Sequence, residues 1–285
     1  MRIIRKKETG EVKTVQQEIQ GDLITIETLV EDLTAMGVSA GMTLLVHSSM
    51  KAMGGWMPGG PVDVVLALEQ VLGPEGTLVM PTHTSGLSDP GGWSMPPVRE
   101  SWWEPIRRTM PAYDPDLTPT RNMGAIPECF RKQKGAVRSL HPQLSFAARG
   151  NRVQDIVADH PLEFGMGERS PLARIYEAEG WVLLLGVGHG NNTSLHLAEM
   201  RADFPGKTEM TAKAPIVRDG IREWASFREL DYDSSDFEAI GRDFAKHTGL
   251  VRSGRIANAM AMLMPQKPLV DYGVCWMERN RQAGG

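Results

Sequence analysis

The sequence predicts an α/β fold, a mixed, largely parallel sheet flanked by helices, and three observations point to it. Short apolar runs that stop at glycine or polar residues, as buried strands do, lie at 42–49, 76–84 and 180–190. Between the first two, apolar residues recur at near-helical spacing, with Pro61 in the first turn and Gly73 at the end. This order of strand, helix and strand favours parallel strands joined by a right-handed crossover.

The remaining elements follow from local signals. Asp219-Gly220 predicts a hairpin turn, and a helical pattern that begins near 236 ends at Gly249. The segment 85–121 is rich in proline and tryptophan and has little periodicity, which is typical of a binding loop. We therefore expect a single domain over residues 1–285, with a substrate loop at about 85–121.

Composition excludes several classes of protein. The net charge of −4 gives no general attraction to nucleic acid or to an anionic membrane. No apolar run reaches the roughly 18 residues that a membrane span requires, and the charged segment 1–18 lacks the apolar core of a signal peptide. Cys129 and Cys275 lie too far apart in sequence to form a recognisable redox or zinc motif. These features predict a cytoplasmic protein that acts on a small molecule, and a homodimer is compatible with them.

Polar residues follow all three predicted strands. They are His47, Ser48 and Ser49 after the first, Thr82, His83 and Thr84 after the second, and His189, Asn191 and Asn192 after the third. Ligands of open α/β sheets bind beyond the carboxyl ends of the strands, so this edge is the predicted site.

His196 and Glu199 form the most informative pair at that edge. If Asn192 or Thr193 caps a helix, the two side chains lie on one helical face within reach of each other. The positive potential of a helix N-terminus disfavours imidazolium and Glu199 favours it, which together suit a general base near neutral pH. Spacing alone nevertheless favours an ordinary surface pair beside a capped helix.

Other motifs are weaker. The glycine-rich segment after His47-Ser48-Ser49 brings backbone N–H groups close to a ligand or simply forms a turn. It is not a Walker A loop, and "GVGHGNN" lacks the third glycine of a dinucleotide fingerprint. Neither the serine-hydrolase motif GxSxG nor a compact metal-ligand spacing occurs, so we predict no metal site. The histidines considered for a metal were His47, His83, His141, His189 and His196.

Two acidic segments have two interpretations each. The run 231–238 is a solvated turn or, near the pocket, an attractor for a polycation. Asp89, Glu100 and Glu104 are similar, but the neighbouring residues Trp93, Trp102 and Trp103 favour a binding surface.

The order of motifs along the chain resembles the aminoglycoside N3-acetyltransferase family, also called antibiotic N-acetyltransferases. The motifs lie between about residues 23 and 279 and read, in order, "LLVHSSMKAMGGWMPGGPVDVVLALEQVLGPEGTLVMPTHT", "SDPGGW", "TPTRNMGAIPECFR", "RSLHPQLSFAARG", "FGMGERSPLARIYE" and "LLLGVGHGNNTSLHLAE".

The resemblance implies an α/β fold distinct from the GCN5-related acetyltransferases, with acetyl-coenzyme A as donor and the 3-amino group of a 2-deoxystreptamine aminoglycoside as acceptor. It implies that His196 is the general base, that Glu199 supports it, and that Thr193 belongs to the same motif. Coenzyme contacts are expected at His47, Ser48, Ser49, Met50, Ser145 and Phe146. Asp89, Trp93 and Glu100 are expected to contact the aminoglycoside.

Two alternatives stay open on sequence. A protein of the same fold would acetylate another amine or bind coenzyme A without aminoglycoside turnover. A metal-dependent hydrolase would use the histidines instead.

Overall fold

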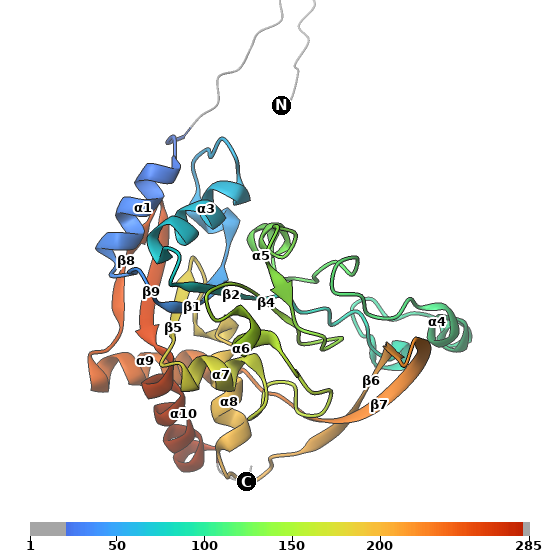
Figure 1. Cartoon of the computed structure of the whole chain (residues 1–285). Coiled ribbons are helices and arrows are strands. Elements are labelled where there is room, and N and C mark those ends of the chain that lie inside the picture. The colour runs from blue at the N-terminus through green and yellow to red at the C-terminus, as the bar shows by residue number, and fades with distance from the viewer. Residues whose placement is uncertain (1–20, 282–285) are drawn as a thin grey trace, which may run out of the picture.

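The computed structural model describes residues 21–281 and contains a seven-stranded mixed sheet with helices on both faces (Figure 1). The strand order is β3 (Val137–Arg138), β4 (Phe146–Gly150), β2 (Thr77–Pro81), β1 (Thr43–Ser48), β5 (Trp181–Leu185), β9 (Ala259–Pro265) and β8 (Arg252–Ile256). Strand β1 pairs in parallel with β2 and β5, and the other neighbouring pairs are antiparallel. Strands β1, β2, β3, β5 and β8 therefore run one way and β4 and β9 the other, which confirms the predicted mixed α/β class.

The first helical layer covers one face of the sheet. It contains α1 (Ile26–Ala35), α2 (Met50–Met53), α3 (Pro61–Leu72) and α5 (Ala125–Phe130). Side chains alternate along a strand, so Leu44 and Val46 of β1 point into this layer. The predicted strand, helix and strand unit is confirmed as β1, α3 and β2.

The second helical layer covers the opposite face and carries the site. It contains α6 (Val153–Val157), α7 (Pro171–Glu177), α8 (Ser194–Arg201), α9 (Phe237–Thr248) and α10 (Gln266–Asn280). Leu45 of β1 and Leu195 of α8 pack in the same apolar core on this side. Gly249 ends α9 in the left-handed conformation, with φ 66°, as predicted.

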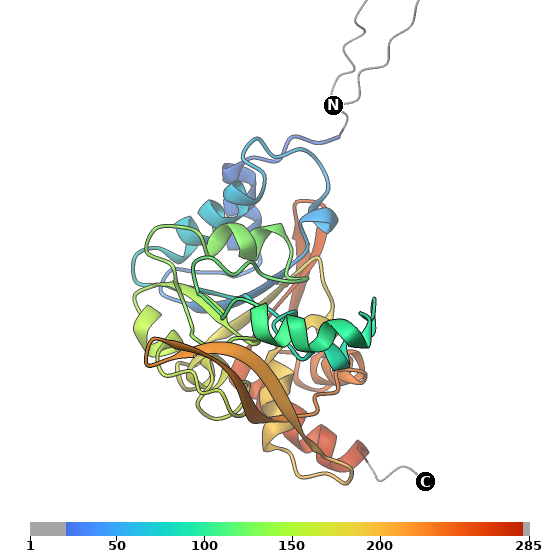
Figure 2. The same cartoon turned by 90° about the vertical axis from the view of Figure 1, so that its right-hand side faces the viewer.

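A two-stranded hairpin projects from the body together with part of the segment 85–121 (Figures 1 and 2). Strands β6 (Glu209–Arg218) and β7 (Ile221–Leu230) join through the predicted turn. Beside them lie η1 (Pro90–Gly92), η2 (Glu100–Trp102) and α4 (Trp103–Thr109). We call residues 85–121 with β6 and β7 the arm.

The arm is held together by contacts between its two parts. The backbone N–H of Tyr113 donates to Pro215 O at 3.0 Å, and the Arg222 guanidinium donates to the carbonyls of Met110 and Arg107 at 2.9 and 2.6 Å. The predicted loop is therefore partly helical and docked, a feature that its short turns and prolines concealed in the sequence.

Two sequence observations concern other parts of the chain. The charged segment 1–18 lies outside the described residues. Within residues 21–281, no helix has both the length and the apolar character that a membrane crossing needs.

Candidate active site

The carboxyl ends of the three parallel strands meet at one edge of the sheet. Strand β1 ends in His47 and Ser48, and β5 leads through η3 (His189–Asn191) into α8. A small pocket of about 80 Å³ opens between them; its lining includes His47, Ser48, Pro81, Asn191 and Thr193. The sequence prediction that strand-end polar residues converge is correct for these side chains.

His196 and Glu199 form a hydrogen-bonded pair on α8. Nδ1 of His196 lies 2.8 Å from Oε2 of Glu199, and the side chains are 15% and 1% exposed. An ionised carboxylate only accepts hydrogen bonds, so Nδ1 of a neutral His196 carries the hydrogen and Nε2 keeps its lone pair. The pair is thus more buried than the surface interaction that spacing alone favours.

The second oxygen of Glu199 is also fully engaged. Oε1 accepts from the Arg281 guanidinium at 2.7 Å and from the Asp233 backbone N–H at 2.9 Å. Burial raises the pKa of Glu199, but the hydrogen bonds from His196, Arg281 and Asp233 outweigh it, and the pKa falls below its usual value. Glu199 therefore remains a carboxylate.

Two aromatic rings enclose the imidazole of His196. The rings of Tyr232 and Phe237 each lie 4.8 Å from it, centroid to centroid. The Tyr232 hydroxyl donates to Oε1 of Glu229 at 2.8 Å, which fixes the ring. These contacts leave little freedom for the imidazole to turn away from Glu199.

The helix that carries His196 starts differently from the prediction. Thr193 occupies the N-cap position without a side-chain capping bond, and Oδ1 of Asn192 accepts from the Ser194 N–H at 3.2 Å. The hydroxyl of Thr193 instead lies 3.4 Å from Nε2 of His47. Thr193 therefore links the motif of His196 to the end of β1.

His47 and His83 are uncharged at neutral pH. Burial, followed by the influence of neighbouring histidines, lowers the pKa of each to about 3. His196 contributes to both shifts, which places all three imidazoles in one electrostatic environment. The Nε2 atom of His83 and the hydroxyl of Ser48 are buried without a hydrogen-bond partner among the described residues. Such atoms are costly when left unpaired, so they favour a ligand at this edge.

The predicted coenzyme contacts Ser145 and Phe146 lie in the interior beside the site, and their contact with the coenzyme stays a prediction. Both side chains are completely buried; Ser145 Oγ bonds to Thr82 and Arg138, and Phe146 packs in the core against the ring of His83. Their sequence neighbourhood belongs to the site's support rather than to its surface.

Ser49 and Met50 lie at the start of α2. Ser49 is its N-cap and accepts from the Ala52 N–H at 3.4 Å. Met50 packs against the apolar core between the sheet and the first helical layer. Both remain partly exposed next to the pocket-lining Ser48.

Asp89, Trp93 and Glu100 belong to the arm. Asp89 pairs with Arg107 at 2.7 Å and with Lys213 at 3.5 Å, while Trp93 Nε1 donates to Ser88 Oγ at 2.9 Å. Glu100 begins η2 and is exposed. All three residues therefore lie on the arm, and Asp89 forms ion pairs with two cations of the arm, Arg107 and Lys213.

The acidic run 231–238 is brought to the His196 site. A pocket of about 260 Å³ is lined by Glu199, Asp231, Asp233, Asp236 and Arg281, among others. The acidic run is recognisable in the sequence, whereas no local pattern points to Arg281, which lies 82 residues beyond Glu199.

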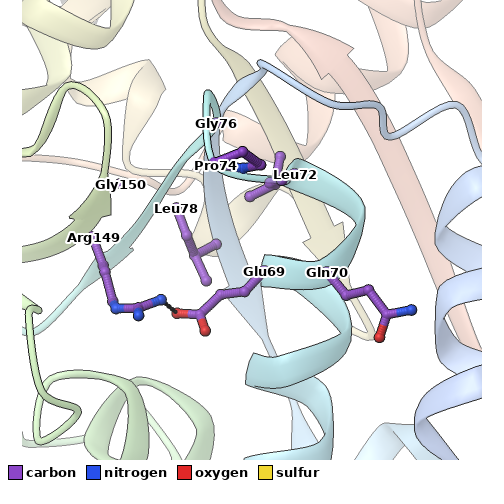
Figure 3. A pocket seen from close by; sticks show the side chains of 9 residues that line it. Glu69, Gln70, Leu72, Pro74, Gly76, Leu78, Arg149 and Gly150 are labelled. Atoms are coloured by element: carbon purple, nitrogen blue, oxygen red, sulfur yellow. Dashed lines mark ion pairs between the residues drawn. The ribbon is translucent and has the colours of Figure 1, made fainter.

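A larger hollow lies at the opposite end of the sheet (Figure 3). It measures about 490 Å³ and lies beside the start of β2 and the end of α3. Figure 3 shows Arg149 and Glu69 reaching toward each other across it, joined by an ion pair of 2.9 Å. We call this hollow the amino-end groove.

No group of three or more His, Cys, Asp or Glu residues within 21–281 is arranged to hold a metal ion. The described residues therefore offer no ligand cluster in support of the hydrolase alternative.

A comparison with protein families identifies the chain's relatives. Residues 45–278 match the model described as aminoglycoside 3-N-acetyltransferase. The chain belongs to the aminoglycoside 3-N-acetyltransferase family. The resemblance seen in the sequence is thereby confirmed, and the family is one of acetyl-transferring enzymes.

Curated relatives match nearly the whole length. The SPbeta prophage-derived aminoglycoside N(3')-acetyltransferase-like protein YokD of Bacillus subtilis is 43% identical over 258 residues, covering 90% of this chain and 93% of that protein. Aminoglycoside N(3)-acetyltransferase VII of Streptomyces paromomycinus is 39% identical over 280 residues, covering 92% and 96%.

Solved structures share the fold. A binary complex of AAC-IIIb with CoASH has a TM-score of 0.81 at 31% identity and covers 93% of this chain and 100% of that one. AAC-VIa bound to sisomicin has the same TM-score at 30% identity and covers 92% and 100%.

Proposed function

We propose that this protein transfers the acetyl group of acetyl-coenzyme A to the 3-amino group of a 2-deoxystreptamine aminoglycoside, with His196 as general base. The observation that carries the proposal is the buried His196–Glu199 pair, 2.8 Å long, at the carboxyl edge of the sheet. The related structures with CoASH and with sisomicin support both ligands.

The orientation of His196 suits it to accept a proton. Because Glu199 accepts a hydrogen bond from the Nδ1–H group, the lone pair of Nε2 is available to an incoming amine. An ammonium group cannot attack a thioester, so the acceptor first loses one proton to solvent and attacks as the free amine, and His196 takes a second proton from the same nitrogen as the new bond forms. Glu199 then stabilises the imidazolium that forms.

The acyl transfer proceeds without an enzyme-bound acyl group. The amine nitrogen forms a bond to the acetyl carbon, the carbonyl becomes an oxyanion, and the C–S bond breaks to release the coenzyme thiolate. We assign the oxyanion to hydroxyl or backbone donors around Ser48, Ser49 and Thr193, of which the Ser48 hydroxyl lacks a hydrogen-bond partner within residues 21–281. The imidazolium of His196 supplies the proton that neutralises the departing thiolate.

The acidic pocket beside Glu199 suits a polycationic acceptor. Asp231 and Asp233 line it, whereas the charges of Glu199 and Asp236 are partly matched by Arg281. Asp89, Trp93 and Glu100 on the arm provide a second acidic and aromatic surface for the same ligand. Opposite charges at such distances favour binding and orientation.

Cellular setting and assembly are also proposals. Cys129 and Cys275 are both free thiols, which fits the reducing cytoplasm that we predict. Assembly as a homodimer stays a prediction.

The deciding experiment measures thiol release from acetyl-coenzyme A with a panel of 2-deoxystreptamine aminoglycosides, with other polyamines, and with no acceptor. We expect release only with the aminoglycosides, and NMR of the product should place the acetyl group on the 3-amino nitrogen. Release with another amine alone would support the alternative acceptor. Coenzyme binding without any release would support a non-catalytic protein.

A further inference from the structure

Arg281 makes the densest set of polar contacts around the His196 site. It follows α10 at its C-terminal end, three residues past the last position of the family match. Its guanidinium donates to Glu199 Oε1 at 2.7 Å, to both oxygens of Asp236 at 2.7 and 2.8 Å, and to the Asp233 carbonyl at 2.7 Å. Its side chain is only 12% exposed and lies 4.9 Å from the Phe204 ring.

Arg281 connects the C-terminal end of α10 to His196 through Glu199. Arg281 reaches Glu199 from the side opposite His196, because each binds a different carboxylate oxygen. Asp236 binds the guanidinium through two parallel bonds, which fixes its plane and therefore the Glu199 carboxylate. Rotation of Glu199 would break the bond to His196.

We propose that Arg281 is a positioning residue that holds Glu199 and limits how strongly this carboxylate stabilises the imidazolium of His196. The inference rests on the proposed role of His196 as base. A positive charge on the far side of Glu199 offsets part of its negative charge, so loss of Arg281 should strengthen the attraction between Glu199 and a protonated imidazole.

Other charged and titratable groups also face His196. His47 at the end of β1 and His83 after β2 stay neutral, with pKa values of about 3. Asp233 and Tyr232 precede α9; the Asp233 carboxyl has a lowered pKa because of bonds from Ser235, while burial raises the pKa of the Tyr232 hydroxyl. Arg281 is the cation hydrogen-bonded to Glu199, whereas Lys207, which lines the same pocket, interacts with Glu199 through its charge alone among the described residues.

The sign of the effect distinguishes this role from simple structural support. In R281M the unopposed carboxylate should raise the pKa of the His196–Glu199 pair, so the acidic limb of the kcat/KM profile moves up by about one pH unit. D236N removes a negative charge that balances Arg281. The more exposed positive charge of Arg281 disfavours the imidazolium, so the acidic limb of the kcat/KM profile should move to lower pH. R281K keeps the charge and should shift the limb less than R281M.

The experiment combines these profiles with an NMR titration of the imidazole carbons, in which H196Q identifies the His196 signal. R201M is the matched control, because Arg201 of α8 forms a comparable bidentate pair with Glu168 at 2.7 and 2.9 Å away from Glu199. Opposite shifts in R281M and D236N, with none in R201M, are the expected result.

Unchanged midpoints, or shifts of the same sign in both variants, would overturn the inference. The titration reads the His196 signal directly, so it stays informative even if no acceptor is acetylated. Absence of thiol release from the wild type would instead count against the proposed function. If R281M does not fold, D236N and R281K still test the predicted direction.

Discussion

The two ends of the sheet contrast in what they offer a ligand. The amino-end groove is the larger hollow, about 490 Å³, yet its carboxylate Glu69 is engaged by Arg149 and by Gln133, each at 2.9 Å. The carboxyl edge has a pocket of only about 80 Å³ beside His47 and Ser48. Volume alone would therefore favour the amino-end groove, whereas we propose the carboxyl edge as the site.

The two ends differ in the kinds of groups that they bring together, because buried side-chain atoms that lack a hydrogen bond within residues 21–281 occur at both, Glu69 Oε1 of the amino-end groove among them. At the carboxyl edge, Ser48 Oγ, His83 Nε2 and Asn192 Nδ2 are buried without a partner in the described chain. Each such atom has given up water, and a bound ligand can restore what it lost. The same edge carries the oriented His196–Glu199 pair.

Replacing the base should produce the largest effect. H196Q keeps a polar side chain but cannot take up a proton, so we expect kcat/KM for acetyl transfer to fall by about 10³-fold. Coenzyme A affinity, measured by calorimetry, should change little. The matched control is H247Q, because His247 lies on the exposed end of α9; comparable losses in both variants would contradict the account.

Neutralising equivalent carboxylates at the two ends sharpens the comparison. Glu199 and Glu69 each pair with an arginine. E199Q keeps an acceptor oxygen for His196 but removes the negative charge that stabilises the imidazolium, and we expect about a 10²-fold loss of kcat/KM. E69Q should keep activity within about twofold of wild type. If E69Q lowered kcat/KM as much as E199Q does, the amino-end groove would take part in acetyl transfer.

Acid stability should depend on the buried histidines of the carboxyl edge. Their pKa values of about 3 in the fold lie below the ordinary 6.5, mainly because of burial. Below pH 6.5 the unfolded chain binds protons that the folded His47 and His83 refuse, so stability is lost as pH falls from 6.5 toward 3. Each histidine should lower the unfolding free energy by about 1.4 kcal/mol for each pH unit in that window.

Urea unfolding at pH 6.5, 5.5 and 4.5 measures this slope. H83Q removes one of these groups and should flatten the dependence by about its share, while leaving the dependence due to His47 and to the buried His141 and His160, whose pKa values are also lowered. Equal slopes for wild type and H83Q would show that His83 is not held neutral.

The smallest effect is expected on the arm. Asp89 already pairs with Arg107 and Lys213. A cationic acceptor must therefore compete with these two side chains for the Asp89 carboxylate. D89N should raise KM for the aminoglycoside about fivefold, roughly 1 kcal/mol, and leave kcat nearly unchanged. D159N, outside the arm, serves as control. A change in kcat with constant KM would remove Asp89 from acceptor binding.

Much of the fold could be predicted from local pattern. The strand runs, the helix between Pro61 and Gly73, and the hairpin at Asp219-Gly220 each carry their signal in adjacent residues, and the structure confirms them. The antiparallel strand β9 was missed because it pairs with β5, which is distant in sequence. Such pairing leaves no turn motif next to the strand. Helix α4 was missed because a single short helix flanked by prolines shows little periodicity.

The site was predictable only where it is local. His196 and Glu199 are three residues apart, so helical spacing revealed their pairing. Arg281 and Tyr232 come from distant segments, and their proximity to the pair is a product of the fold. For Ser145 and Phe146 the motif did not reveal that both side chains are buried, because burial also depends on distant segments.

The most direct test of the account is an experimental structure with coenzyme A and a 2-deoxystreptamine aminoglycoside bound together. The account predicts the 3-amino nitrogen within hydrogen-bonding distance of His196 Nε2, and the coenzyme sulfur at the edge formed by Ser48 and Thr193. A ligand pair seated in the amino-end groove by Arg149, or an acceptor amine remote from His196, would contradict it.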